Sequence, residues 1–426
     1  MVGMAAMVLL WSAVSARAGR ANVTAPIAFL LMGMVMGSFD ALPIVGDSGS
    51  LLLISELTLA MILFHDAATV RLSDLRRDWQ IPLRLLAIAF PLTVAVMAAS
   101  AYWLIPSLGV AGAILVGAAV APTDAGLGAP TVLNPSVPVR VRRALNVESG
   151  LNDGLATPIV LAALAVLSSD LNGGGESAGL IISGLAIPLG MLAGAVIGVG
   201  GAMLLDRSRL AGSSTTRSRS LGVLAVPFLA YGAAELIGAN AFIAAFVAGL
   251  AFSRVAKCIV EEPDVNLAAE DAADLLGYLV WFLAGLVGIQ GTNLLSDWRW
   301  WVLAVLALTL ARMVPVWLAL LGMHLRLPTV LFIGWFGPRG LATVVFALLT
   351  LETLGESHPI MGDIGGILGL TVLLSVILHG ITAGPLVQRY TQWVSANQTE
   401  IENEPSPEPM PSRGRHAHLR KQARKP

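Results

Sequence analysis

Charged residues and cysteine are both scarce in this sequence. Only 12% of the 426 residues are charged, whereas a typical soluble domain has about 25%. The single cysteine, Cys258, excludes a disulfide within the chain and fits no metal-site spacing. The formal net charge of −1 says little about partners, and no nucleic acid is expected among them. Together with a mean hydropathy of +0.78, this scarcity excludes an ordinary soluble domain.

The hydrophobic residues, 56% of the chain, form long runs with the charged residues between them. By the roughly 20-residue length of a bilayer span we count about 13 such runs. They lie near 2–16, 24–38, 50–67, 81–104, 110–132, 145–168, 177–205, 220–238, 240–253, 273–290, 298–321, 328–351 and 363–387. The first run has no basic n-region before it and no small-residue cleavage site, so it is predicted to be a span and not a signal peptide. The sequence predicts an all-α polytopic membrane protein.

Basic residues are confined to alternate connecting loops. One set of loops contains Arg17, Arg20, Arg71, Arg76, Arg77, Arg140, Arg142, Arg143, Arg207, Arg209, Arg217, Arg219, Arg254, Lys257 and Arg326. The other set, at 37–49, 105–109, 169–175, 238–240, 290–297 and 352–363, has no Lys or Arg. The positive-inside rule makes the first set cytoplasmic, with the N-terminus outside and the C-terminus inside a bacterial inner membrane. Residues 391–426 are polar and rich in proline and are predicted to form a disordered cytoplasmic tail.

Two of the apolar runs are interrupted by proline and glycine. Residues 121–126 read A-P-T-D-A-G, and residues 334–340 read G-W-F-G-P-R-G. Proline removes a helical hydrogen bond, and glycine lowers the cost of unwinding. Paired broken helices at corresponding places in two halves indicate a transporter binding site. Since the fifth and twelfth spans insert in opposite directions, we expect spans 1–6 and 8–13 to form an inverted repeat.

Residues 145–160 carry an unusual number of polar groups for a membrane helix. At about 100° per residue, Ser149 and Asp153 share one helix face, and Glu148 and Asn152 share a neighbouring face. A buried carboxylate is stabilised by a proton or by a small cation, and it cannot hold both. That competition is the minimal chemistry of exchange. A carboxylate merely satisfied by helix-end donors is the alternative for Asp153.

Several other polar groups lie within the apolar runs. Hydroxyl and carbonyl oxygens suit a hard cation, and Thr123 and the backbone around Asp124 provide them. Buried Arg339 needs a counter-charge, for which Glu148 is the candidate. A further buried cation, Arg312, is left without an assigned partner, and a pair with Asp124 is one option. Asp66 either lines the cytoplasmic approach or is a structural helix-end carboxylate.

Five segments resemble the NhaP-type bacterial monovalent cation:proton antiporters. They are 64–67 (F-H-D-A), 122–124 (P-T-D), 141–154 (V-R-R-A-L-N-V-E-S-G-L-N-D-G), 240–249 (N-A-F-I-A-A-F-V-A-G) and 334–340. The resemblance covers residues 2–390, so residues 1–390 are expected to form one antiporter domain. It implies 13 spans, with a core formed by helices 81–168 and 298–387 and a dimerisation domain formed by the rest. Ala125 departs from the family, which often has proline after the Thr-Asp pair.

The resemblance also implies roles for individual residues. Asp153 is expected to bind the ion or proton, with Ser149 and Thr123 as ligands of the transported cation. Asn152 marks relatives that exchange without net charge movement. The resemblance further implies a structural bridge between Glu148 and Arg339, and Asp66 matches an acidic position near the site.

The function predicted from these residues is exchange of Na⁺, Li⁺ or K⁺ for H⁺ by a homodimer in the lipid bilayer, without a cofactor or enzymatic chemistry. An organic-anion/sodium symporter in which Arg339 binds a carboxylate is the alternative transporter. An intramembrane hydrolase would need Asp124 and Asp153 in catalytic register. A membrane scaffold or sensor would transport nothing.

Overall fold

The computed structural model describes residues 2–20, 23–38, 48–69, 79–124, 126–132, 134–171, 175–290 and 296–397. All regular structure within these ranges is helical, as predicted. The N-terminal part contains α1 (Val2–Arg20), α2 (Ala25–Gly37), α3 (Ser48–Thr69), α5 (Gln80–Arg84), η1 (Leu85–Ala89), α6 (Phe90–Leu104), η2 (Pro106–Leu108), α7 (Gly109–Val120), α8 (Ala129–Val132) and α9 (Val139–Leu171). The C-terminal part contains α10 (Gly175–Leu210), α11 (Thr216–Leu236), α12 (Ala241–Val255), α13 (Cys258–Glu261), η3 (Pro263–Asn266), α14 (Leu267–Gln290), α15 (Trp298–Leu308), α16 (Leu310–Ala319), α17 (Leu327–Trp335), α18 (Leu341–Leu354) and α19 (Met361–Asn397).

The predicted apolar runs coincide with these helices. Among the described residues, five helical stretches are long and apolar enough to cross a membrane: Gln80–Leu104, Val139–Ser168, Leu185–Leu210, Trp298–Ala319 and Met361–Asn397. Five more apolar helices are shorter: Met4–Gly19, Ala25–Gly37, Pro106–Val120, Ala241–Val255 and Leu341–Leu354. Hydropathy therefore located the helices correctly along the chain.

Helix ends were located less well than helix centres. Helix α9 begins at Val139, directly after Pro138, so Arg142 and Arg143 lie inside its first turns and are buried. The sequence had placed them in a loop, but proline favours the start of a helix and basic side chains do not stop one. Helix α19 continues to Asn397, so the predicted tail boundary at 391 is wrong by about two turns. The rest of the predicted tail, 398–426, and Ala125 lie outside the described residues.

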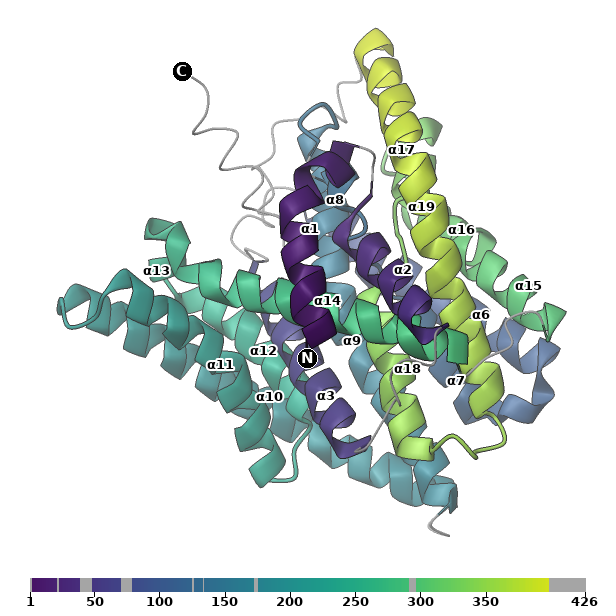
Figure 1. Ribbon diagram of the computed structural model, residues 1–426, viewed down its shortest axis with the longest axis horizontal. Coiled ribbons are helices and arrows are strands. Elements are labelled where there is room, and N and C mark those ends of the chain that lie inside the picture. The colour runs from purple at the N-terminus through teal and green to yellow at the C-terminus, as the bar shows by residue number, and fades with distance from the viewer. Residues whose placement is uncertain are drawn as a thin grey trace.

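Two groups of helices lie on opposite sides of the molecule. In Figure 1, α10 to α13 form the left part, and α6, α15, α16 and α19 form the right part. Helices α10 and α12 approach closely because glycines on α10 face the α12 backbone. A Cβ at Gly190, Gly194 or Gly198 would overlap the carbonyl oxygen of Asn240, Ala244 or Ala248, respectively. These glycines therefore pack one helix of the chain against another.

Several helix ends are fixed by polar side chains. Asn240 begins α12 by accepting a 3.0 Å hydrogen bond from the amide of Ile243, and Asp297 begins α15 by accepting a 2.8 Å bond from the amide of Arg299. Arg84 donates to the carbonyl oxygen of Leu321 (2.7 Å), just past the end of α16. Near the end of α13, the guanidinium of Arg219 holds the pKa of Glu262 below its ordinary value.

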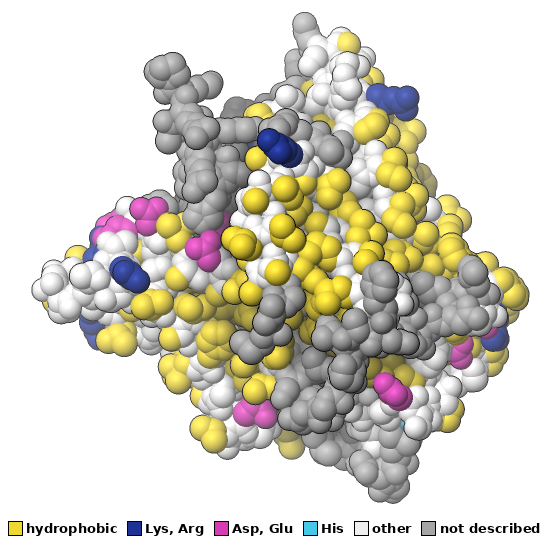
Figure 2. Space-filling model, in the orientation of Figure 1, with side chains coloured by type: hydrophobic (Ala, Val, Ile, Leu, Met, Phe, Trp, Pro, Cys, Tyr) yellow, Lys and Arg dark blue, Asp and Glu magenta, His cyan; other side chains and the backbone are white. Residues whose placement is uncertain are grey.

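The outer surface is largely apolar. Figure 2 shows apolar side chains over most of the described part of this face, with the few charged side chains mainly towards its edges. On α10, Leu185, Leu192, Val196 and Leu204 are all more than half exposed. An exposed apolar surface of this extent is suited to contact with lipid.

Helices α7 and α17 both stop inside the molecule. Helix α7 ends at Val120, and α17 ends at Trp335. In both cases the chain becomes helical again within a few residues, as α8 at Ala129 and α18 at Leu341. The predicted breaks are therefore present. They also touch, because the amide of Asp124 donates to the carbonyl oxygen of Pro338 over 2.8 Å.

Candidate functional site

Helix α9 presents its polar side chains to the interior at the level of the two breaks. Glu148, Ser149, Asn152 and Asp153 are all buried, and none is more than 5% exposed. Helix α9 packs against α7, α10, α3 and α18, which enclose it within the bundle. The carboxylate of Asp153 is therefore kept from bulk water, as its predicted role requires.

Thr123 in the first break joins two of these α9 side chains. The Ser149 hydroxyl donates to the carbonyl oxygen of Thr123 over 2.6 Å. The side-chain amide of Asn152 donates to the Thr123 hydroxyl over 2.7 Å. Ser149 and Asn152 are three residues apart and both bond to Thr123, so these two side chains of α9 contact the same segment.

Oxygen atoms converge at this point. The amide oxygen of Asn152 is buried and has no hydrogen-bond partner among the described residues. The hydroxyl and carbonyl of Thr123 and the hydroxyl of Ser149 belong to the same hydrogen-bonded group, and Asp153 is the next residue of α9 after Asn152. Hydroxyl, carbonyl and carboxylate oxygens are the ligands that hard cations prefer. The arrangement can hold a small cation next to one titratable group.

Asp124 is engaged with backbone amides. Its Oδ1 accepts from the amides of Gly126 (2.6 Å) and Leu127 (3.2 Å), and its Oδ2 accepts from the amide of Leu341 (2.8 Å). A carboxylate at the start of α18 is also favoured by the helix dipole, typically by about 0.3–1 kcal/mol. A Cβ at Gly340 would overlap this carboxylate, so the second break needs glycine there. Asp124 was predicted as an ion or proton ligand, and here it links the two breaks.

The counter-charge of Glu148 is Arg312, on α16. Both terminal nitrogens of Arg312 bond to the Glu148 carboxylate, one of them at 2.9 Å, and both side chains are almost fully buried. The predicted pair of Glu148 with Arg339 is therefore wrong, as is the option of Arg312 with Asp124. A bidentate guanidinium already occupies both oxygens of Glu148, and Asp124 is occupied by amides.

Arg339 is fully buried, and its terminal nitrogens bond to main-chain carbonyls instead of a carboxylate. Its guanidinium donates to the carbonyl oxygens of Gly337 (3.2 Å), Ala307 (3.2 Å) and Pro122 (3.5 Å). Unwound backbone leaves carbonyls without helical partners, and a cation can bond several of them at once. Arg339 thus joins the second break to the first break and to α15.

Two polar side chains on α19 were missed by the sequence analysis. Ser375 accepts a 2.7 Å bond from the amide of Arg339, and His379 lies 2.9 Å from the carbonyl oxygen of Trp335. Both are buried in an otherwise apolar stretch, four residues apart. A serine and a histidine at that spacing within a membrane helix were the available signal.

Asp66 lies on α3 and not on α9 or in either break. It is buried near the end of α3, and its carbonyl oxygen accepts a 2.8 Å bond from the Thr69 hydroxyl. Helix α3 packs against α9, so Asp66 lies on an element next to the site. Its role as an approach residue stays a prediction.

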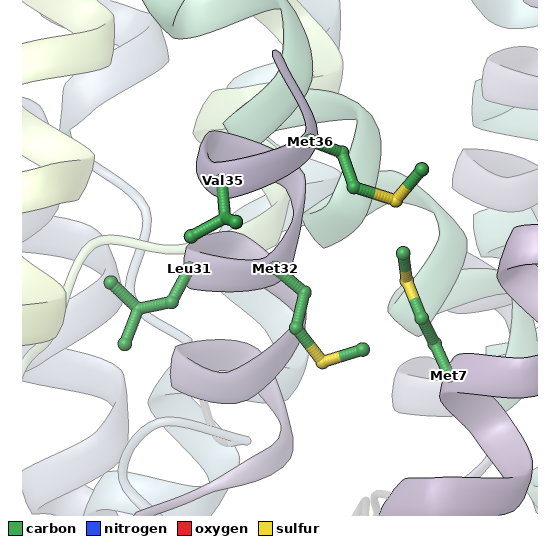
Figure 3. Close-up of a pocket in the computed structure, with 5 residues that line it drawn as sticks. All are labelled: Met7, Leu31, Met32, Val35 and Met36. Carbon is green, nitrogen blue, oxygen red and sulfur yellow. The ribbon is translucent and has the colours of Figure 1, made fainter. Parts of the chain in front are cut away.

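A separate cavity of about 230 Å³ lies between α1 and α2, lined by Met7, Leu31, Met32, Val35 and Met36. Figure 3 shows that the three methionines and two aliphatic side chains present only carbon and sulfur to this space. A hard cation finds no oxygen ligand there. The candidate ion site is therefore the crossing of the two breaks and not this cavity.

Comparison with known proteins agrees with this architecture. Residues 4–389 match the family model described as the transmembrane sodium/hydrogen exchanger. A Na⁺/H⁺ antiporter of Schizosaccharomyces pombe is 26% identical over 68% of this chain and 68% of its own length. The K⁺/H⁺ antiporter NhaP2 of Shewanella oneidensis is 25% identical over 92% of this chain and 65% of its own length.

A solved structure has the same fold. The sodium proton antiporter MjNhaP1 from Methanocaldococcus jannaschii superposes with a TM-score of 0.71 at 20% identity, covering 91% of this chain and 97% of that one. The chain thus spans about two thirds of the length of the curated relatives and nearly all of the solved one. The resemblance inferred from the motifs is confirmed, and the chain belongs to the sodium/hydrogen exchanger family.

Proposed function

We propose that this protein exchanges a monovalent cation for protons across a membrane. The proposal rests on the burial of Asp153. Asp153 follows Asn152 on α9, and Asn152 bonds to Thr123 in the unwound segment after α7. Relatives named as Na⁺/H⁺ and K⁺/H⁺ antiporters support the same activity. No covalent step is needed for it.

In the proposed cycle Asp153 holds a proton or a cation in turn. A desolvated carboxylate favours its neutral form until a cation enters and compensates its charge. Ser149, Thr123 and Asn152 supply neutral oxygens around that cation. Release of the cation on one side is followed by protonation, so in each cycle one cation crosses the membrane in one direction and one proton crosses in the other.

The proposed topology has 13 spans arranged as an inverted repeat around the two crossing breaks. The N-terminus is then outside and the C-terminus in the cytoplasm of a bacterium, where the exchange contributes to pH homeostasis. We assign α5–α9 and α15–α19 to a core that moves as alternating access requires. The remaining helices form a scaffold that dimerises.

A symporter for organic anions is the weaker candidate. It would use Arg339 to bind a carboxylate substrate, but the Arg339 guanidinium already donates to three backbone carbonyls. Breaking those bonds at full burial would cost several kcal/mol. No observation favours this alternative over cation exchange.

The purified full-length chain in liposomes tests the proposed function. With a trapped pH dye, we expect addition of Na⁺, Li⁺ or K⁺ to dissipate a preset proton gradient, and the ranking of the three to give the selectivity. Choline is the control cation, because it is too large to bind between side chains that are joined to Thr123 by direct hydrogen bonds. A flat dye signal for every inorganic cation would refute exchange.

The exchange is expected to be electroneutral because Asn152 stands beside a single exchanging carboxylate. The wild-type rate should therefore be the same with the membrane potential clamped at zero and with the inside negative. In Asn152→Asp a second carboxylate enters the site, and we expect the rate to become dependent on potential. A potential-dependent wild-type rate would contradict the proposed one-for-one exchange.

A further inference from the structure

His379 lies between two backbone carbonyl oxygens. Its Nδ1 is 2.9 Å from the carbonyl oxygen of Ser375, and its Nε2 is 2.9 Å from that of Trp335. Each carbonyl oxygen can accept a hydrogen bond from the ring only through an N–H group, but a neutral imidazole has only one N–H group. Only the doubly protonated ring can donate to both. The ring is 3% exposed, so water does not replace a lost partner.

His379 belongs to a stripe on α19 that holds both ends of the second break. The carbonyl of Trp335, where α17 ends, faces His379, and the amide of Arg339, where the break ends, donates to Ser375. The Trp335 indole also donates to the Thr382 hydroxyl over 3.0 Å and stacks on the His379 ring, with centroids 5.3 Å apart. Ser375, His379 and Thr382 are spaced as one face of a helix.

Neutral His379 has a second arrangement within reach. The Ser375 hydroxyl is 3.4 Å from Nδ1 and can donate to that nitrogen once it loses its proton. The same hydroxyl oxygen accepts the amide of Arg339. A change in ring protonation therefore alters the hydrogen bonds of Ser375, and through them the end of the break that carries Arg339. The carbonyl of Trp335 keeps its 2.8 Å bond from the amide of Gly337 in either arrangement.

The charges that face the ring come from neighbouring segments. They are the guanidinium groups of Arg339, in the second break, and Arg312, on α16. Arg312 is paired with Glu148 of α9. Helix α19 itself has no charged side chain between Asp363 and Arg389, and α17 has none. A displacement of the break relative to α19 would therefore change the charge beside His379.

From this geometry we propose that His379 is a positioning residue for the second break, and that its protonation state sets how firmly α19 holds that break. The exchange rate then responds to pH through His379 in addition to Asp153. The inference rests on the proposed exchange function, but its structural part, the titration of one buried ring between two carbonyls, stands without it.

Two measurements on the full-length chain test the inference. The first is the ¹⁵N spectrum of histidine-labelled protein in nanodiscs, with the His379 signals identified as those missing from His379→Gln. We record the spectrum from about pH 4.5 to about pH 8.5 and expect the ring to convert from two protonated nitrogens to one within this interval. The second is the pH profile of cation-driven proton flux in liposomes. Over the same interval the relative rate should change about threefold more in the wild type than in His379→Gln.

Thr382→Val is the matched control on the same stripe. It removes the other side-chain contact to Trp335 without removing a titratable group, so we expect a lower rate at every pH and an unchanged profile shape. The proposal is overturned if the His379 ring keeps one protonation state over the interval, or if the normalised profiles of His379→Gln and the wild type superimpose. His379→Asn replaces the glutamine variant should that variant not fold. A chain without flux for any cation refutes the exchange function, whereas the ring titration still decides the positioning role.

Discussion

Asp153→Asn is expected to reduce cation-driven proton flux to the level of protein-free liposomes. An amide has nearly the same shape as a carboxyl group, but it neither binds a proton in this pH range nor compensates the charge of a cation. Every step of the proposed cycle passes through this one carboxylate, so no partial cycle remains. The measurement is the initial rate of dye dequenching at saturating Na⁺, Li⁺ and K⁺, with equal amounts of reconstituted protein.

Asp363→Asn is the matched control for this substitution. Asp363 accepts a 2.8 Å bond from the Trp300 indole near the start of α19, and an amide oxygen can accept the same bond. We expect that variant to retain exchange. Unaltered folding of Asp153→Asn, measured by its thermal unfolding, shows that the loss is chemical. Substantial flux through well-folded Asp153→Asn would remove Asp153 from the centre of the mechanism.

Removing one partner of the Glu148–Arg312 pair is expected to destabilise the protein by about 3–5 kcal/mol. Both side chains are almost fully buried, and either Glu148→Gln or Arg312→Met leaves the other charge without its counter-ion. The double variant should recover part of the loss, because no lone charge remains. Thermal unfolding of the wild type, both single variants and the double variant gives the coupling between the two sites.

Arg209→Gln provides the control for a charge pair near water. Arg209 pairs with Glu261, whose side chain is 53% exposed, and we expect its loss to lower the unfolding temperature much less than loss of either buried partner does. Arg339→Met tests which of the two buried arginines is the partner of Glu148, since this substitution leaves the bidentate pair of Glu148 and Arg312 intact. Additive effects of Glu148→Gln and Arg312→Met would contradict the pairing.

Hydropathy and local breaker residues were enough to predict the positions of the helices and of both breaks. The signals are local: a run of apolar residues is long enough to span or it is not, and Pro122 or Pro338 cannot donate a helical bond wherever it lies. The same reasoning fails at helix ends such as Val139 and Asn397. There, polar residues continue a helix beyond its apolar run, because charge does not oppose helix formation.

The partner of Glu148 could not be predicted in the same way. Arg312 and Arg339 lie on different helices, and which of them faces α9 depends on how α16 is rotated and how the second break turns. No property of either arginine in the sequence distinguishes them. His379 was overlooked for a related reason. Its proposed role depends on contacts with two carbonyl oxygens from different segments, and the sequence does not show that these segments meet.

The direct bonds between the two breaks have a mechanical consequence. Asp124 bonds through its amide to Pro338 and through its carboxylate to Leu341, and the Thr343 hydroxyl donates to Ala119 over 2.8 Å. Pulling the breaks apart would strand these groups away from water at several kcal/mol each. We therefore expect them to travel as a single stiff block. Relative movement of two helices costs less free energy where their contacts are apolar and non-directional. One such contact is that of the Phe246 ring of α12 with Gly154 of α9, next to Asp153.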